Sequence, residues 1–401
     1  MSAGTGTAAS YDQAPVGLVL AAPVGLVLAA PVGLVLAAPA SSCGKTTLTL
    51  AVLRCLRNQG RRVASVKAGP DYIDPAFHAA ASGRPCLNLD IWAMRPQTLA
   101  RLAWNAALDA ELVIAEGVMG LFDGPAIGSG SGSTADLALA TGWPLVLIVD
   151  VKGQATSAAA TVLGFDRFRP GLRLAGVIFN RVGGERHERM LREAVEALGV
   201  PVLGCVRRRP ELALPDRHLG LVQAAEHPDL EAFLERAAIF AGHEIDLPAL
   251  CAVARPLRLP SINNLPSIIK KITCLPPLGQ RIAIARDVAF SFAYDWLLAA
   301  WRALGVETLP FSPLANEGPR DDADAVYLPG GYPELHAGQL AGNRNFHDGL
   351  AAAAKAGKPV FGECGGYMVL GQGLTDGNGQ RHPMAGLLGV ETSLVKRQLH
   401  L

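Results

Sequence analysis

The 401-residue sequence predicts an α/β protein with two domains, each built on a mostly parallel sheet. Short apolar runs rich in Val, Ile and Leu alternate with helical patterns along most of the chain. A phosphate-binding motif follows the first of these runs, and a glycine-rich turn around a cysteine follows one of the last. At about 150 residues per domain the length allows two or three domains. Hydrophobic residues make up 50% of the chain, which is enough to bury such cores.

The first strand is expected at residues 32–37, at the end of an uncharged run that covers residues 13–44. About 20 apolar residues can span a membrane. However, residues 1–12 contain no Lys or Arg, and a proline recurs at every eighth position of the run, which breaks helices. The run is an octapeptide, APVGLVLA, copied at 14–21, 22–29 and 30–37. We therefore expect no membrane segment, and we interpret residues 1–29 as a surplus, flexible repeat without function.

The remaining elements complete two alternating α/β patterns. In the first pattern we expect strands at 62–66, 112–115, 145–150 and 174–180, and helices after residue 45 and at 185–198. In the second we expect strands at 281–285, 325–328 and 359–362, and helices at 294–304 and 346–356. The proline-rich stretch between them predicts a linker. The predicted division is a doubly wound P-loop domain at 30–245, a linker at 246–279 and a second α/β domain at 280–401.

Gly44, Lys45, Thr46 and Thr47 lie between the first strand and a helical pattern. A P-loop needs this context, because its backbone N–H groups and the helix N-terminus face the phosphates. Lys45 would reach the β- and γ-phosphates and Thr46 would hold Mg²⁺. The match to GxxxxGK[ST] is incomplete, since Pro39 stands at the first glycine position.

Four acidic residues follow the next two strands. Asp71 and Asp74 lie in a Gly/Pro loop after the second strand, where an ordinary turn is the alternative interpretation. Glu116 and Asp123 follow the third strand, where a P-loop fold places the carboxylate that organises Mg²⁺. Asn180 ends a later strand at a position suited to contacting a base. Together these residues predict Mg-ATP binding and phosphoryl transfer.

The second domain contains a Gly362-x-Cys364-x-Gly366 turn, which has the pattern of a nucleophile elbow. Small residues allow the tight turn, and a helix N-terminus would lower the pKa of the thiol. The N–H groups of Gly365 and Gly331 could form an oxyanion hole. The alternative is a buried structural cysteine, which is how we interpret the other six cysteines.

The composition excludes some classes of function. Lys plus Arg number 36 and Asp plus Glu number 35, a net charge of +1 that does not favour nucleic-acid binding. The seven cysteines form no CxxC pair, so a disulfide scaffold or zinc site is not expected. A reducing, cytoplasmic location follows from the same observation.

Several motifs resemble the cobyrinic acid a,c-diamide synthase family. In the first domain, which in that family is similar to dethiobiotin synthetase, they are APASSCGKTT, VKAGPDYIDPAFH, GRPCLNLDIWAM and AEGVMGLFDG. In the second they are LPGGYPELHAGQLAGN and GECGGYMVLG, which resemble the family's flavodoxin-like class I glutamine amidotransferase domain.

The resemblance implies ATP-dependent amidation of the a and c carboxylates of cobyrinic or hydrogenobyrinic acid in cobalamin biosynthesis. The carboxylate would be phosphorylated first, with Mg²⁺ as cofactor and glutamine or ammonia as nitrogen donor, in a homodimer. Cys364 would attack glutamine. The resemblance assigns phosphate or substrate contacts to Lys45 and Lys67. The acids that it assigns to metal binding or to carboxylate activation are Asp71, Asp74, Glu116 and Asp123.

Two departures from the family pattern are visible. The family usually has glycine where Ser42 lies, so the loop is expected to approach phosphate less closely. A GHExHYS-like segment with the catalytic histidine is absent, and only His382 and His400 follow Cys364. We expect His382 in a solvated loop and His400 in a frayed end. The resemblance therefore predicts an incomplete second domain, with weak glutamine-driven turnover and ammonia still usable.

Two other interpretations remain open at this point. A P-loop ATPase with a deviant motif that acts as a switch shares the GKT motif and the acid at a strand end. It does not need GPDYIDP or the cysteine elbow, and those two features favour the ligase. A non-functional product of a damaged gene is the third interpretation.

Overall fold

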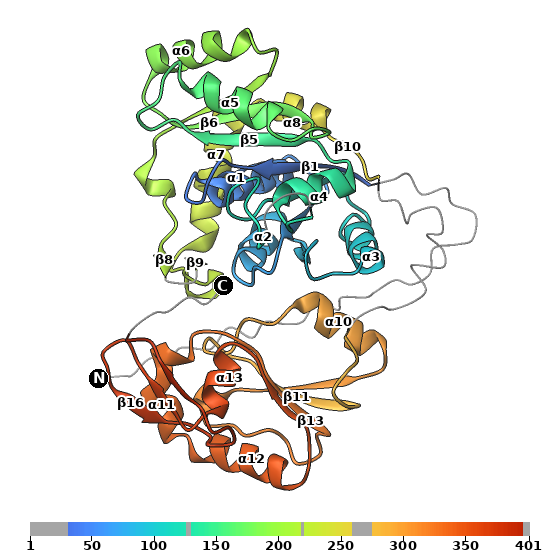
Figure 1. The fold of residues 1–401 in the computed structure, drawn as a ribbon, viewed down its shortest axis with the longest axis vertical. Helices are drawn as coiled ribbons and strands as arrows, with labels where there is room; N and C mark the ends of the chain where they lie inside the picture. The colour runs from blue at the N-terminus through green and yellow to red at the C-terminus, as the bar shows by residue number, and fades with distance from the viewer. Residues whose placement is uncertain (1–30, 126–129, 218–219, 259–274, 396–401) are drawn as a thin grey trace, which may run out of the picture.

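The computed structural model describes residues 31–125, 130–217, 220–258 and 275–395. The surplus repeat predicted for residues 1–29 therefore lies outside the described residues. The described chain forms an α/β fold with two large sheets, one above the other in Figure 1. None of the described helices is long and apolar enough to cross a membrane.

The first sheet has the strand order β3-β2-β4-β1-β5-β6-β7, and all neighbours in this path are parallel. A short strand, β10, adds to β1 in the antiparallel direction. The strands are β1 (Val32–Ala37), β2 (Val63–Ala68), β3 (Leu87–Leu89), β4 (Leu112–Glu116), β5 (Leu145–Asp150), β6 (Leu174–Val182), β7 (Val202–Arg207) and β10 (Arg255–Pro256).

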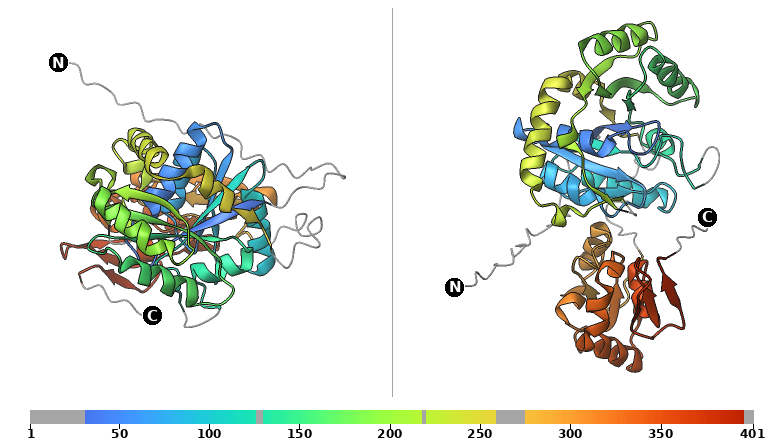
Figure 2. Two further views of the ribbon diagram at one scale, coloured as in Figure 1. Left: turned by 90° about the horizontal axis from the view of Figure 1, so that it is seen from above. Right: turned by 90° about the vertical axis from the view of Figure 1, so that its left-hand side faces the viewer.

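Helices cover both faces of this sheet, so the predicted doubly wound fold is confirmed. One face carries α1 (Lys45–Asn58), α2 (Asp74–Ser82), α7 (Leu230–Glu244) and α8 (Leu247–Val253). The other carries α3 (Pro96–Ala106), α4 (Thr134–Thr141), α5 (Ala158–Arg167) and α6 (Glu185–Glu196). Figures 1 and 2 show these two layers.

Strand β1 has the bounds predicted from the sequence, and its continuous apolar sequence reflects burial on both sides. Leu34 and Leu36 point into the core beneath α1 and α7, while Val35 and Ala37 point into the opposite core. Its neighbours are β4 and β5, so the chain order reverses on either side of it. Ligands of such sheets bind at this switch point, beyond the carboxyl ends of the strands.

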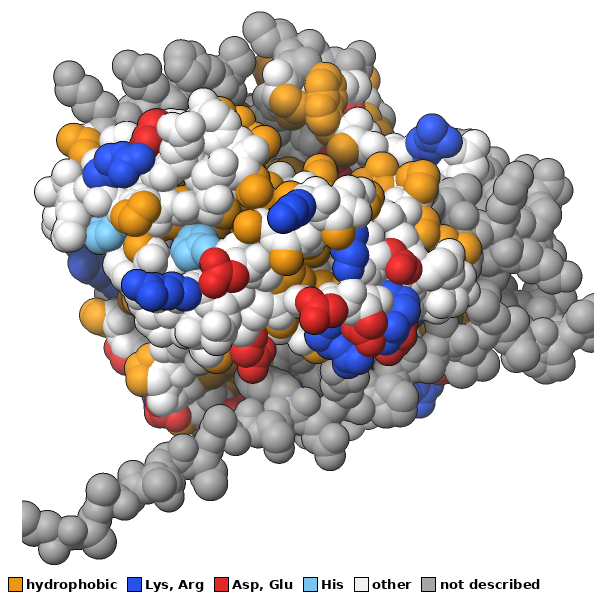
Figure 3. Space-filling model, turned by 90° about the horizontal axis from the view of Figure 1, so that it is seen from below, with side chains coloured by type: hydrophobic (Ala, Val, Ile, Leu, Met, Phe, Trp, Pro, Cys, Tyr) orange, Lys and Arg blue, Asp and Glu red, His pale blue; other side chains and the backbone are white. Residues whose placement is uncertain are grey.

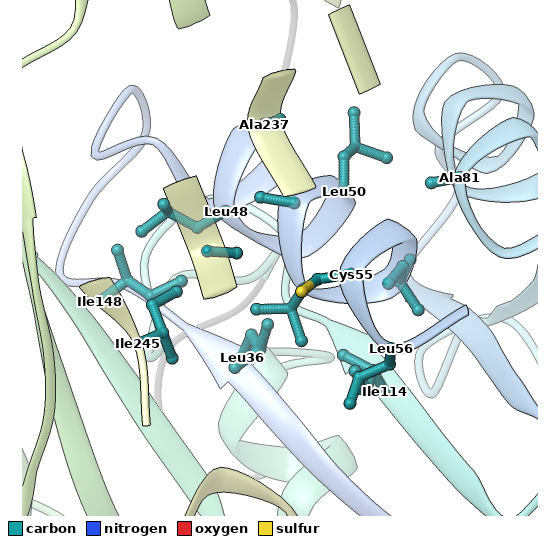
Figure 4. Close-up of a cluster of buried hydrophobic side chains, with 14 of the residues drawn as sticks. Leu36, Leu48, Leu50, Cys55, Leu56, Ala81, Ile114, Ile148, Ala237 and Ile245 are labelled. Atoms are coloured by element: carbon teal, nitrogen blue, oxygen red, sulfur yellow. The ribbon is translucent and has the colours of Figure 1, made fainter. Parts of the chain in front are cut away.

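The core above β1 is formed by the packing of α1 against α7 (Figure 4). Leu50 of α1 and Ala237 of α7 are fully buried in this cluster. Outside the cluster, the Arg54 guanidinium forms ion pairs with Glu231 and Glu235 across the same helix pair. Helix α1 begins at the P-loop, so this packing holds the loop in place.

Part of the segment predicted as a linker packs on the first sheet. Leu247 and Leu250 of α8 are buried in the core of the first sheet, and Arg255 and Pro256 pair with Gly33 and Val32 of β1. The predicted linker at 246–279 therefore begins inside structure that covers the first sheet.

The second large sheet has the order β12-β11-β13-β14 and is also parallel. Its strands are β11 (Arg281–Ala285), β12 (Glu307–Phe311), β13 (Ala325–Leu328) and β14 (Val360–Gly362). The helices around it are α10 (Asp295–Ala303), α11 (Ala337–Gly342), α12 (Arg344–Lys355) and α13 (Gly365–Leu370). A small sheet follows, with the strands β15 (Gly373–Thr375), β16 (Arg381–Pro383) and β17 (Glu391–Ser393).

The predicted environment of His382 is wrong. His382 lies on β16, is only 8% exposed, and its Nε2 lies 3.0 Å from Asp376 Oδ2. Asp376 also accepts the N–H groups of Asn378 and Gln380 in the turn between β15 and β16. This carboxylate orders the predicted loop into a hairpin that buries the histidine. His400 lies outside the described residues.

We expect Leu50→Ala to lower the free energy of unfolding by about 2–5 kcal/mol, because it leaves a cavity in a fully buried site. The control is Leu163→Ala on α5, where the leucine is 44% exposed and the change should cost about 0.5 kcal/mol or less. Urea unfolding of both variants measures this. Equal losses would contradict the assignment of the core to the α1–α7 layer.

Candidate functional site

The P-loop lies where β1 ends and α1 begins. Gly44 has φ +88°, and a Cβ there would lie 2.2 Å from Asn180 Nδ2, so no larger residue fits. Asn180 is buried near the end of β6, and its Nδ2 donates to the Cys43 carbonyl at 2.8 Å. The structure therefore brings the predicted base-contacting residue to the P-loop. Ser42 has φ +62°, a conformation that favours glycine, which agrees with the departure noted in the sequence.

Lys45 crosses the P-loop and is held by backbone carbonyls. Its Nζ donates to the Met119 carbonyl at 2.5 Å and lies 3.4 Å from the Ala40 carbonyl. Burial lowers the pKa of Lys45. The loop after β4, which carries Met119, therefore closes against the P-loop. A phosphate group would take the place of these carbonyls as the partner of the ammonium.

The centre of the site is the Lys67 ammonium, which is buried among three carboxylates. Its Nζ lies 2.5 Å from Asp74 Oδ2, 2.8 Å from Glu116 Oε1 and 3.7 Å from Asp71 Oδ2. Thr46 Oγ1 lies 2.7 Å from the same Glu116 oxygen and 3.2 Å from the same Asp74 oxygen. We name these five residues the carboxylate cluster. Strands β1, β2 and β4 end side by side, so residues that are far apart in the sequence lie close together in space here.

The charges of this cluster shift its pKa values. Burial opposes a charge on Lys67, but the three carboxylates raise its pKa well above its usual value. Burial also raises the pKa of Asp74 to about 6, against the opposing effect of Lys67. For Glu116 the balance is reversed, since Lys67 and His78 outweigh its burial and lower its pKa. Asp74 therefore takes up a proton more readily than Glu116.

His78 is a site residue that the sequence reasoning missed. It is fully buried, and its Nε2 lies 2.6 Å from Glu116 Oε2, while its Nδ1 lies 3.5 Å from Cys86 Sγ. Burial opposes its charge, but Cys86 and Glu116 raise the pKa of His78 to about 10. His78 follows Asp74 by four residues on α2, so both lie on one helix face. This spacing was the signal in the sequence that could have identified His78.

The loop with Asp71 and Asp74 is fixed by its own hydrogen bonds. Asp71 Oδ1 accepts the N–H groups of Ile73 at 2.8 Å and Asp74 at 3.0 Å, so it closes the turn that leads into α2. Asn88 of β3 donates to the Asp71 carbonyl at 2.7 Å. The turn that was the alternative interpretation is present, and it also places the acids in the cluster.

Asp123 lies apart from the carboxylate cluster. It is exposed, and its Oδ2 accepts the Gly120 N–H at 2.9 Å within the loop after β4. That loop approaches the P-loop, because a Cβ at Gly120 would lie 2.6 Å from the Pro39 carbonyl. The structure therefore brings Asp123 to the rim of the P-loop rather than to Lys67, and its catalytic role stays a prediction.

The described residues include no group of three or more His, Cys, Asp or Glu side chains that could hold a metal ion by themselves. Mg²⁺ in nucleotide sites is held by one or two protein oxygens together with phosphates and water. The hydroxyl and carboxylate oxygens of the cluster are the donor types that Mg²⁺ prefers. The residues present therefore fit a magnesium ion that enters with its nucleotide.

Cys364 lies in the sharp turn between β14 and α13, with φ +50°. A Cβ at Gly362 would lie 2.8 Å from the Gly366 backbone, and a Cβ at Gly366 would lie 2.0 Å from the Leu328 carbonyl. Both glycines of the predicted elbow are thus needed for close backbone packing. Cys364 is exposed, whereas four of the other described cysteines are buried and Cys251 is partly exposed. Cys274 lies outside the described residues.

The predicted oxyanion-hole residues also come together at Cys364. A Cβ at Gly365 would lie 3.2 Å from the Gly331 nitrogen. A Cβ at Gly330 would lie 2.9 Å from the Cys364 Cβ. In the part of the chain that the structure describes, no hydrogen bond joins the Cys364 thiol to a histidine. The His382 ring contacts Asp376 instead. The assembled parts are therefore the thiol and its flanking backbone.

The two halves of the chain match two family models. Residues 34–222 match the CobQ/CobB/MinD/ParA nucleotide binding domain, and residues 281–400 match the CobB/CobQ-like glutamine amidotransferase domain. The chain is 55% identical over 364 residues to the hydrogenobyrinate a,c-diamide synthase of Brucella anthropi. The matched region covers 90% of this chain and 81% of that protein. The chain belongs to this family. The resemblance predicted from the sequence motifs is confirmed.

Two further hydrogenobyrinate a,c-diamide synthases show the same relation. That of Rhodobacter capsulatus is 55% identical over 364 residues, with 90% of this chain and 81% of the relative covered. That of Rhizobium meliloti is 53% identical over 362 residues, with 90% and 82% covered. Membership of the family confirms that the first half is a nucleotide-binding domain and that the second half is a glutamine amidotransferase domain.

Asp74→Asn is expected to stabilise the protein near pH 7.5 when nucleotide and metal are withheld. The raised pKa of Asp74, about 6, means that its ionisation is opposed by the fold, so this residue costs stability as the pH rises from about 4 to 6. The gain of the asparagine variant should therefore be complete above pH 6 and shrink toward zero near pH 4. Urea unfolding at several pH values measures it. A variant less stable than the original at pH 7.5 would contradict the conclusion that ionised Asp74 destabilises the fold.

Proposed function

We propose that the chain amidates the a and c carboxylates of hydrogenobyrinic or cobyrinic acid with ATP, using glutamine or ammonia as nitrogen donor. It is an ATP-dependent carbon–nitrogen ligase of cobalamin biosynthesis. The observation that carries the proposal is the carboxylate cluster beside a P-loop, in a chain that also contains a cysteine elbow. Identity of 50–55% to hydrogenobyrinate a,c-diamide synthases over 90% of the chain supports it.

The first step forms an acyl phosphate. A substrate carboxylate oxygen attacks the γ-phosphorus of ATP, the bond to the β,γ-bridging oxygen breaks, and ADP leaves. Lys45 leaves the Met119 carbonyl and stabilises the charge on the β- and γ-phosphates. Gly44, Thr46 and Thr47 offer backbone N–H groups at the start of α1. Mg²⁺, held by Thr46, Asp71 and Glu116, would neutralise phosphate charge when bound.

The second step forms the amide. Ammonia attacks the carbonyl carbon of the acyl phosphate, phosphate leaves, and the attacking nitrogen loses a proton. A pKa of about 6 suits Asp74 to accept that proton near neutral pH. Lys67 lies against the same carboxyl group and stabilises negative charge next to it. Asp123 at the rim of the P-loop is proposed to assist in orienting the carboxylate.

The second domain supplies the ammonia. The Cys364 sulfur attacks the side-chain amide carbon of glutamine, forms a γ-glutamyl thioester and releases ammonia, and water then frees glutamate. Gly331 and Gly365 lie close to each other in the turns around Cys364, and their N–H groups would stabilise the oxyanion. Free ammonia can replace this half of the reaction.

We further propose a cytoplasmic homodimer that acts on small molecules, with no nucleic-acid or membrane partner. The near-zero net charge supports the absence of a nucleic-acid partner. On the face of the second domain that points away from the first, acidic and basic side chains lie beside one another (Figure 3). A nucleic-acid site would show a continuous basic stripe instead.

Lys45→Ala is expected to abolish the rise in melting temperature caused by Mg-ATP, because the ammonium is the P-loop's main charge toward the phosphates. Differential scanning fluorimetry measures the shift. The same variant should lose ammonia-dependent ATP hydrolysis that hydrogenobyrinic acid stimulates. ATP hydrolysis indifferent to this corrinoid in the unaltered chain would favour a P-loop switch over the ligase.

Cys364→Ala is expected to keep amidation with ammonium chloride within about twofold and to lose any amidation with glutamine. Only the glutamine half-reaction needs the thiol as nucleophile. Mass spectrometry of the corrinoid product distinguishes the two donors, and Cys251→Ala serves as control. Glutamine-dependent product from the Cys364→Ala variant would contradict the assigned nucleophile.

A further inference from the structure

Tyr72 lies between two residues of the first site and contacts the second half of the chain. It stands in the loop between Asp71 and Asp74, and its ring stacks on two rings that follow β11. The centroid of the Tyr72 ring lies 4.4 Å from that of Tyr294 and 5.4 Å from that of Phe292. The Tyr72 and Phe292 rings are within 7° of parallel. Neither the sequence motifs nor the proposed reaction assigns a role to this stack.

On the first side, the position of Tyr72 is linked to groups that a nucleotide contacts. Thr46 of the P-loop hydrogen-bonds Asp74, and Asp71 closes the same turn by accepting the Ile73 and Asp74 N–H groups. In the proposed function Mg-ATP engages Thr46, which would replace or alter the bond from Thr46 to Asp74. A change in that hydrogen bond would therefore move the turn that contains Tyr72.

On the second side, the stack leads to the thiol. The Phe292 N–H donates to the Gly330 carbonyl at 2.9 Å. Gly330 packs directly on Cys364, since a Cβ there would lie 3.1 Å from the sulfur. Phe292 also meets the ring of Tyr332, the residue after Gly331, edge to face at 5.2 Å between centroids. A displacement of Phe292 therefore acts on both chain neighbours of Gly331, a residue of the predicted oxyanion hole.

Another contact joins the two halves independently of Tyr72. Gln223 Nε2 donates to the Val288 carbonyl at 3.0 Å, and the Arg217 guanidinium lies 5.5 Å from the Tyr332 ring centre. The docking of the halves does not depend on Tyr72 alone. Gln223 therefore offers a matched control, because its substitution removes an interdomain contact without touching the stack.

We propose that Tyr72 is a positioning residue that couples the two sites, so that nucleotide in the P-loop changes the surroundings of the Cys364 thiol. The proposal rests on the proposed function in one respect, namely that the P-loop binds Mg-nucleotide. Packed aromatic rings transmit displacement because they leave no free space between them. Removing the Tyr72 ring breaks the contact between Asp71–Asp74 and Phe292.

The test measures the rate at which iodoacetamide alkylates Cys364, by mass spectrometry of its peptide, with and without Mg-adenylyl imidodiphosphate. Cys364 is exposed and therefore accessible to the reagent. In the unaltered chain, in Tyr72→Phe and in Gln223→Ala, we expect nucleotide to change the rate about fivefold or more, a factor typical of coupled sites. In Tyr72→Ala we expect a change below about twofold.

Nucleotide affinity, measured by titration calorimetry on each variant, separates the two ways of failing. If the unaltered chain does not bind the nucleotide, the proposed function fails and the coupling fails with it. If it binds while the Cys364 rate stays constant, only the coupling is overturned. If Tyr72→Ala does not fold or bind, Phe292→Leu removes the Tyr72–Phe292 contact, which is the one that leads to Gly330, and must also abolish the effect. Equal loss in Gln223→Ala would show that docking, not the stack, carries the signal.

Discussion

The interaction on which the first site depends is the buried Lys67 ammonium among the carboxylates of Asp71, Asp74 and Glu116. Three carboxylates this close would repel one another strongly in a buried setting, so a permanent cation is required. Lys67 offsets part of that charge, but burial, together with the charges of Glu116 and Asp71, still raises the pKa of Asp74. The site therefore keeps an excess of negative charge that a magnesium ion can use and a carboxyl group able to accept a proton.

The parallel sheet creates this arrangement. Lys67 is the second-last residue of β2, Glu116 ends β4 and the P-loop follows β1, and β4 pairs with both of the other strands. The order of strands brings together side chains that are 21 to 70 positions apart in the sequence. The second sheet repeats the principle, because β13 and β14 end beside each other and present Gly330 and Cys364 to one another.

Much of the fold was predictable because each strand carries its own local signal. The bounds of β1, β5, β11 and β13 agree with those predicted, since continuous apolar runs between glycines and prolines define buried strands. The identities of Lys45, Asp74 and Cys364 as site residues followed from turns next to such strands. What failed depended on contacts distant in sequence. His382 became buried because Asp376 orders its hairpin, and His78 joined the site through the Glu116 carboxylate.

The most direct measurement is mass spectrometry of hydrogenobyrinic acid incubated with the chain, Mg-ATP and ammonium chloride. The predicted result is conversion of two carboxylates into amides, dependent on ATP, with less than about one hundredth of the rate in Lys67→Met, because the carboxylate cluster then lacks its cation. ATP hydrolysis without amide formation, or undiminished amidation by Lys67→Met, would contradict the central role of this cluster.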